Sequence, residues 1–232
     1  MKSTKKALIL VLATLIFCNI NTSAKDYDYD FDYGMLFGAS VSKNLTDRLS
    51  AMAELDFWLN DNFTGYERLQ PAISLTYTVI PKYLKATVYY TYLNQENTLT
   101  GKHDVNRHRY HLRLIGSYAT KHVSFSLTTK FEQTHTRGVK SPNNKWRNQL
   151  KAVGSISKEC PWKPFVSIEI FESMNGRNSL GTTGLERVRY EAGTSYVVTP
   201  WLTLDMKLRA ERQVAKKLLY SSIGLGLKFT IP

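Results

Sequence analysis

The chain is poor in cysteine and lacks a long hydrophobic run. Only two cysteines, Cys18 and Cys160, occur among its 232 residues. Its longest apolar run, residues 7–17, is shorter than the roughly 20 residues that a membrane-spanning helix needs. Because Cys18 falls in a leader, Cys160 is expected to be the only thiol left, and no internal disulfide can form. The disulfide-stapled class of small secreted domains is thereby excluded.

The first 24 residues have the anatomy of a secretory signal peptide. Three lysines open the segment, the apolar run follows, and the small residues 22–24 close it. A lipoprotein signal ending at Cys18 is the alternative, but Phe17 stands where a small residue should precede the lipidated cysteine. We therefore predict an exported protein with a cleaved leader, residues 1–24, and a mature domain, residues 25–232.

Recognisable catalytic and ligand-binding motifs are also missing from the sequence. There is no Gly-x-Ser-x-Gly elbow, no His/Cys cluster with metal-ligand spacing and no nucleic-acid-binding motif. The sequence therefore predicts no cofactor, no metal and no nucleic-acid partner. An enzyme remains the alternative: a lipid-modifying outer-membrane protein whose site lies at the outer rim of a β-barrel. Its candidate residues are His103 and His135, which fall in or near polar connections, with Ser141 and Asn143 nearby.

What the chain does have is long runs in which apolar and polar residues alternate. In residues 106–119, one face carries aromatic and aliphatic side chains and the other carries Arg107, Arg109 and Arg113, since successive side chains of a strand point to opposite sides. Eleven such runs are present, among them residues 35–42, 49–59, 69–79, 84–93, 106–119, 123–132, 145–158, 185–198, 201–212 and 219–231.

Run length and the order of the connections favour a membrane barrel over a soluble sandwich. The runs are about 10 to 13 residues long, enough for a tilted strand to cross a bilayer, whereas strands of globular proteins average about 5 or 6 residues. Short turns, as at Pro81 and Pro200, alternate with longer polar connections such as residues 94–105. Aromatic residues near the ends of runs predict interfacial girdles; they are Trp58, Tyr89, Tyr90, Tyr92, Trp146, Trp162, Trp201 and Tyr220.

These features predict an all-β fold, a single transmembrane antiparallel up-and-down β-barrel in the outer membrane with short periplasmic turns and longer outer loops. Bacterial barrels have even strand numbers, so we predict twelve strands, with ten as the alternative. The twelfth strand would be residues 26–33, where aspartates alternate with aromatic residues before a sharp bend at Gly34. An acidic arm that lies inside a basic lumen is the alternative for this segment. A soluble periplasmic binder of the lipocalin type is the alternative that periodicity alone leaves open.

The polar faces of the runs are expected to line the lumen, with basic residues in excess. The chain has 31 Lys and Arg against 19 Asp and Glu, a formal net charge of +12. Two interpretations follow: cross-strand ion pairs fill the lumen of a structural envelope protein, or the cationic surplus makes a narrow anion-preferring pore. The candidate lumen-lining charged residues are Arg107, Arg109, Arg113, Arg147, Lys151, Glu169, Arg187, Arg189, Glu191, Lys207 and Arg209.

Four segments resemble a known family of barrels. They are residues 108–113 (HRYHLR), 144–147 (NKWR), 167–172 (SIEIFE) and 186–190 (ERVRY). In their order and spacing they resemble the outer-membrane barrels of the domain-of-unknown-function family 2490 (DUF2490), of Bacteroidetes type, over about residues 33–231. The resemblance implies a barrel with inward rows of arginine and glutamate, with Glu169 and Phe171 both pointing inward, and no established activity.

The expected partners follow from this location. They are outer-membrane lipid and lipopolysaccharide, and the barrel-assembly machinery during insertion. Loop lysines such as Lys102 and Lys140 would face anionic lipopolysaccharide. The barrel is expected to be a monomer and not an enzyme.

Overall fold

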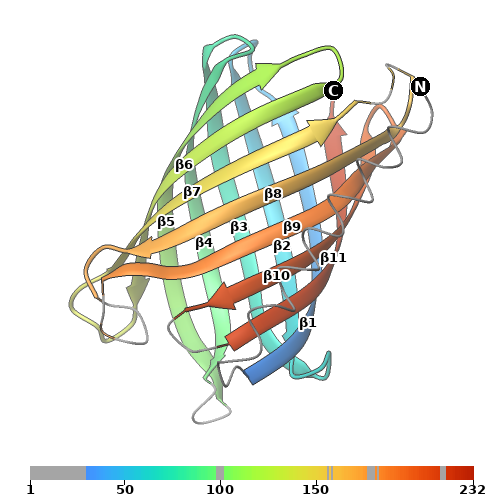
Figure 1. Cartoon of the computed structure of the whole chain (residues 1–232). Coiled ribbons are helices and arrows are strands. Elements are labelled where there is room, and N and C mark those ends of the chain that lie inside the picture. The colour runs from blue at the N-terminus through green and yellow to red at the C-terminus, as the bar shows by residue number, and fades with distance from the viewer. Residues whose placement is uncertain are drawn as a thin grey trace. The chain divides into compact units, whose positions relative to one another are not determined.

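Strands form along the alternating runs and close on themselves into a barrel (Figure 1). The structure is a computed structural model that describes residues 30–97, 102–155, 157, 159–176, 181, 183–214 and 218–232. Within the described residues, no helix is both long and apolar enough to cross a membrane. The described part contains eleven strands: β1 Asp30–Asn44, β2 Leu49–Asn60, β3 Gly65–Ile80, β4 Leu84–Asn97, β5 Lys102–Ala119, β6 Val123–Thr136, β7 Asn143–Gly154, β8 Trp162–Ser173, β9 Gly184–Thr199, β10 Leu202–Gln213 and β11 Leu218–Ile231.

Each strand pairs antiparallel with the next strand along the chain. The registers keep equivalent faces together, because Leu112 lies opposite Phe131 and Arg113 lies opposite Lys130. β1 and β11 are neighbours and close the barrel. Since the number of strands is odd and every other pair is antiparallel, these two strands run in the same direction. Between them the Ser42 hydroxyl donates to the carbonyl oxygen of Phe229 at 3.3 Å.

The outer surface of the barrel is apolar and its interior is charged. Leu112, Leu127 and Leu208 are 60 %, 58 % and 57 % exposed on the outside. Inside, Glu132 and Glu169 are each only 2 % exposed. A soluble protein has the reverse distribution. The chain is therefore a transmembrane β-barrel whose apolar outer surface meets lipid.

The connections alternate between the two ends of the barrel. The end at which β1 joins β2 is called here the β1–β2 end, and its described residues are 45–48, 81–83, 120–122, 155, 157, 159–161 and 200–201. The opposite end is called the β2–β3 end, and its described residues are 61–64, 137–142, 174–176, 181, 183 and 214. The predicted run 145–158 is longer than the strand, because β7 ends at Gly154. Before β8 begins, the Cys160 N–H donates a hydrogen bond to the Ser157 hydroxyl at 3.0 Å.

The eleven strands of the described residues are one fewer than the predicted twelve. Residues 30–33 do not form a separate strand, because they continue without a turn into Met35 as the start of β1. Residues 26–29, the rest of the predicted twelfth strand, lie outside the described residues.

Three of the aromatic residues predicted for the interfacial girdles lie inside the barrel instead. Trp58, Tyr89 and Tyr220 are 4 %, 8 % and 6 % exposed. The prediction was wrong because it used their position near strand ends and not their side-chain parity. Trp58, for example, lies two residues from Asp56 and therefore shares its inward face. The other three tryptophans, Trp146, Trp162 and Trp201, are exposed on the outer face.

Two glycines make room for a lysine inside the barrel. Gly193 and Gly224 lie opposite Lys207 on its two neighbouring strands. A Cβ atom at residue 193 would collide with the carbonyl oxygen of Met206, and one at residue 224 would lie 2.7 Å from carbons of the Lys207 side chain. The absence of a side chain at both positions therefore lets Lys207 lie along the wall.

Candidate functional site

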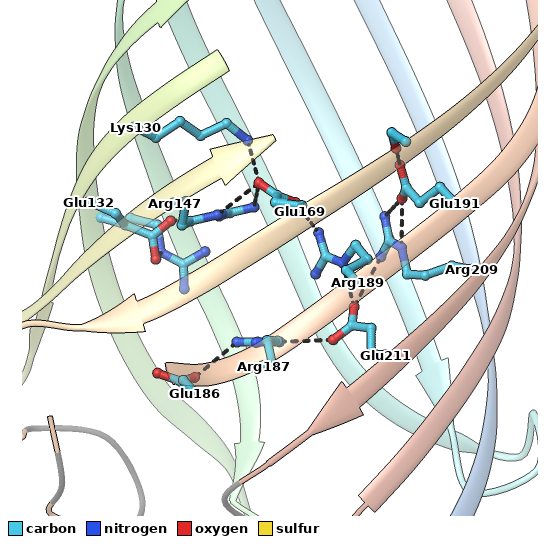
Figure 2. Close-up of polar contacts among 12 residues, drawn as sticks. Lys130, Glu132, Arg147, Glu169, Glu186, Arg187, Arg189, Glu191, Arg209 and Glu211 are labelled. Atoms are coloured by element: carbon cyan, nitrogen blue, oxygen red, sulfur yellow. Dashed lines mark hydrogen bonds and ion pairs between the residues drawn. The ribbon is translucent and has the colours of Figure 1, made fainter. Parts of the chain in front are cut away.

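The lumen wall from β5 to β10 carries a network of ion pairs centred on Glu169 (Figure 2). The Oε1 atom of Glu169 accepts hydrogen bonds from Lys130 Nζ and Arg147 Nη2, both at 2.9 Å, and its Oε2 atom accepts one from Arg189 Nη1 at 3.1 Å. The donors belong to β6, β7 and β9, so one carboxylate on β8 connects four strands. Because Glu169 is almost fully buried, its charge depends on these partners.

Three further glutamates extend the network to both sides of Glu169. Each is held by arginines of adjacent strands: Glu132 by Arg109 (3.3 Å) and Arg147 (2.7 Å), Glu211 by Arg187 (3.0 Å) and Arg189 (2.7 Å), and Glu191 by Arg209 (2.6 Å). Several arginines serve two carboxylates, which the five donors of a guanidinium allow. The pairs run along the wall between neighbouring or next-neighbouring strands, so they stiffen the wall and do not bridge the lumen from side to side.

Two aromatic rings each contact more than one arginine of the lumen wall. The guanidinium carbons of Arg147, Arg187 and Arg189 lie 4.3, 4.5 and 4.7 Å from the centroid of the Phe171 ring. All three are within the range of a cation–π interaction. The second ring, Trp58, lies between Arg68 at 4.2 Å and Arg209 at 4.6 Å. The rings thus give a second favourable contact to arginines that carboxylates already hold.

Two adjoining cavities occupy the lumen. The larger one, called the central cavity, has a volume of about 250 Å³ and is bordered by the arginine network on one side and by Gln70, Ala72 and Thr91 on another. The smaller one, about 180 Å³, lies toward the β1–β2 end and is bordered by Lys151 and Lys228. Both cavities share lining residues, among them Glu54, Asp56, Glu191 and Lys207. The lumen therefore keeps space beside the ion pairs at the level of these two cavities.

Cationic side chains outnumber carboxylates in the lining of the central cavity. Nine cationic side chains line it, and they are Arg68, Arg109, Arg113, Lys130, Arg147, Arg187, Arg189, Lys207 and Arg209. Five carboxylates line it as well, and they are Glu54, Asp56, Glu132, Glu169 and Glu191. Low-dielectric walls strengthen the field of such a surplus inside a narrow passage.

Ten of the eleven candidate residues border one of the cavities, and they are Arg109, Arg113, Arg147, Lys151, Glu169, Arg187, Arg189, Glu191, Lys207 and Arg209. The exception, Arg107, borders neither cavity; its Nη1 atom donates to Gln95 Oε1 at 3.2 Å. Sequence reasoning missed the inward Trp58 and Tyr89, and the ion pair of Lys145 with Glu186 at 2.6 Å. Parity would have found Lys145, which lies two residues from Arg147 and shares its face.

Two of the described histidines, on β5 and β6, are hydrogen-bonded to neutral polar side chains. His135 is hydrogen-bonded to Gln133 (3.1 Å) and His108 to the Tyr90 hydroxyl (2.8 Å). The side chain of His103 lies outside the described residues. No group of three or more His, Cys, Asp or Glu side chains that would hold a metal ion occurs among the residues that the structure describes.

An apolar exterior around a closed sheet and a charged lumen define a transmembrane β-barrel of the outer-membrane type. The chain belongs to the family described as Protein of unknown function (DUF2490), whose model matches residues 33–214. This confirms the resemblance seen in the sequence. No curated protein matches the chain in sequence.

Solved structures share the fold at low sequence identity. The NanC porin is 14 % identical, with 86 % of this chain and 99 % of that chain covered and a TM-score of 0.56. LpxR from Salmonella typhimurium is 8 % identical, with 78 % of this chain and 83 % of that chain covered and a TM-score of 0.50. At these identities the likeness is one of fold alone.

Proposed function

We propose that the protein is a narrow outer-membrane pore for small solutes that prefers anions, and that it catalyses no reaction. The observation that carries this proposal is the charge of the side chains that line the central cavity: nine are cationic and five are carboxylates. Rings of arginine and lysine in a pore favour anions. The fold likeness to a protein described as a porin is consistent with this role.

The ion pairs support a pore because they fix the charges without filling the passage. Arg147, for example, is held by both Glu132 and Glu169, so its guanidinium stays at the wall. The opposite side of the central cavity has short neutral side chains, Ala72 and Thr91. These two short side chains lie between Glu54 of β2 and Arg109 of β5, and they leave room for a solute beside the cationic wall.

The proposed location and partners follow from the fold. We place the barrel in the outer membrane, exported by a leader of residues 1–24 that is then removed, with the β1–β2 end in the periplasm. Its apolar surface would contact outer-membrane lipid and lipopolysaccharide, and insertion would depend on the barrel-assembly machinery. We propose that it acts as a monomer.

Planar bilayers test the proposal directly. Purified protein is inserted into a bilayer that separates two KCl concentrations, and the reversal potential is measured. An anion-preferring pore gives a reversal potential displaced toward the chloride equilibrium potential. A potential displaced toward that of potassium contradicts the preference, and the absence of single-channel steps contradicts the pore.

A structural barrel with a closed lumen is the second candidate. One contact favours it: Arg209 on β10 lies against the ring of Trp58 on β2, although β1 and β11 separate these strands in the sheet. This contact narrows the passage at its level. Absence of conductance together with a stable, detergent-soluble barrel would support this candidate.

A further inference from the structure

Among the charged groups that line the central cavity, one cation stands without an acidic partner. Eight of the nine cations have a carboxylate within 4.0 Å. Arg113 is the exception: in the part of the chain that the structure describes, no carboxylate lies within that distance of its guanidinium. Its Nε atom is buried without a hydrogen-bond partner, and its guanidinium carbon lies 4.9 Å from the centroid of the Tyr89 ring.

Two carboxylates that line the same cavity also lack an oppositely charged partner. Glu54 and Asp56 lie two residues apart on the inward face of β2. Among the described residues neither has a cationic group within 4.0 Å. Glu54 accepts a hydrogen bond of 2.6 Å from the Tyr89 hydroxyl, and this is a neutral donor. The lining carboxylates that lack an ion pair are therefore on β2, whereas the lining cation that lacks one is on β5.

Tyr89 lies between the Arg113 guanidinium and the Glu54 carboxylate and keeps the two groups apart. Its ring lies under the Arg113 guanidinium, and its hydroxyl, at the far end of the ring, reaches Glu54. The two opposite charges are thus held apart by about the width of one phenol ring and do not neutralise each other. Charges left unpaired inside a protein are costly unless a bound group satisfies them.

We propose that the central cavity recognises a zwitterionic solute of the α-amino-acid class, with its carboxylate at Arg113 and its ammonium group at Glu54 and Asp56. This inference rests on the proposed function, because it names the organic solute of the same pore. A guanidinium pairs with a carboxylate through two parallel hydrogen bonds. Two neighbouring carboxylates match the three donors of an ammonium group.

A solute with a single charge can pair either with Arg113 or with Glu54 and Asp56, but not with both. An organic anion at Arg113 would face Glu54 and Asp56 across the cavity, and an organic cation at Glu54 would face the arginine network. His111 adds a further polar contact for a side chain, since it lies 4.5 Å from the Tyr89 ring and neither of its ring nitrogens has a hydrogen-bond partner. Ala72 and Thr91 leave room for the solute.

Proteoliposome swelling with two isomers tests the inference. Full-length mature protein is reconstituted, and the swelling rate is measured in isosmotic alanine, a zwitterion, and in isosmotic lactamide, which has the same atoms and no charge. The expected result is faster entry of alanine. Equal rates for the two isomers overturn the inference and leave the pore intact, whereas entry of neither solute overturns the pore and the inference together.

Variants then locate the site. Arg113→Gln and the double variant Glu54→Gln, Asp56→Asn are each expected to abolish the preference for alanine. The matched control is Arg107→Gln, which removes the same charge from the same strand away from the cavities, and it is expected to keep the preference. Equal loss in the control and in Arg113→Gln contradicts a local site.

A binding measurement keeps the inference testable if a variant folds poorly. Alanine binding to the detergent-solubilised wild-type protein is measured by calorimetry, with lactamide as the comparison. Arg113→Lys, which keeps the charge but loses the two-pronged geometry, is expected to weaken binding by about tenfold. Absence of alanine binding to the wild-type protein overturns the inference.

Discussion

The ring of Trp58 on β2 lies 4.6 Å from the guanidinium carbon of Arg209 on β10, a contact between strands that are not neighbours in the sheet. Arg68 of β3 lies against the same ring at 4.2 Å. One indole therefore holds cations from two parts of the wall at one level of the lumen. Leu36 and Tyr220 pack around it as the buried apolar cluster of the described residues.

Removal of this ring should widen the passage. We expect Trp58→Ala to raise single-channel conductance, because it takes away the group that holds Arg209 toward β2. The control is Trp201→Ala, since Trp201 is exposed on the outer face and should leave conductance unchanged. Equal or lower conductance in Trp58→Ala would show that the constriction lies elsewhere.

The centre of the ion-pair network should dominate the stability of the wall. Glu169→Gln leaves Lys130, Arg147 and Arg189 without their shared carboxylate, and loss of one partner from a buried pair costs about 3–5 kcal/mol. The free energy of unfolding is measured by urea titration in detergent, followed by tryptophan fluorescence.

An exposed ion pair of the same lumen serves as the control for Glu169→Gln. Asp205 is paired with Lys228, whose side chain is 52 % exposed. Exposed pairs contribute about 0–1 kcal/mol, so Asp205→Asn should lower the unfolding free energy only slightly. Similar losses in the two variants would mean that burial does not set the strength of these pairs.

The sequence was sufficient to predict which side chains face the lumen, but it did not predict which of them contact one another there. Period-two alternation assigns a face to every residue of a strand, and for this reason Arg113 and Lys207 were predicted to face the lumen from the sequence alone. Partners depend on the register between strands, which alternation does not specify. Nothing in the sequence indicates that Arg189 meets both Glu169 and Glu211 while Arg113 meets neither.

The inward aromatic residues and the strand number were also predicted incompletely from the sequence. Trp58 was predicted for an interface because tryptophan is common there, although its parity with Asp56 already indicated the lumen. The strand number was uncertain because no turn signal separates residues 26–33 from residue 35, and the structure runs residues 30–33 straight into β1.

An arginine on the outer surface distinguishes a lipid-facing barrel from a soluble binder. Leu112 is 60 % exposed, and its partners in register, Val88 and Phe131, are apolar. In a bilayer, Leu112→Arg should cost about 2–4 kcal/mol, because a charge would enter the hydrocarbon region. The measurement is urea unfolding of protein reconstituted in lipid vesicles.

The control for the lipid-facing position lies in a connection. Val139, 50 % exposed between β6 and β7, should tolerate arginine within about 0.5 kcal/mol. If Leu112→Arg is as harmless as Val139→Arg, the apolar outer face does not meet lipid.

Cys160 offers a test of orientation and of the leader at once. It is a free, partly exposed cysteine in the 155–161 connection, at the β1–β2 end of the barrel. A bulky maleimide-polyethylene glycol should label it only after the outer membrane is permeabilised, if that end lies in the periplasm. The label should attach once per molecule if Cys18 is removed with residues 1–24, as proposed. In a Cys160→Ser background, Val139→Cys at the β2–β3 end should be labelled on intact cells. The reverse pattern would invert the barrel in the membrane, and two labels per molecule would show that the leader is retained.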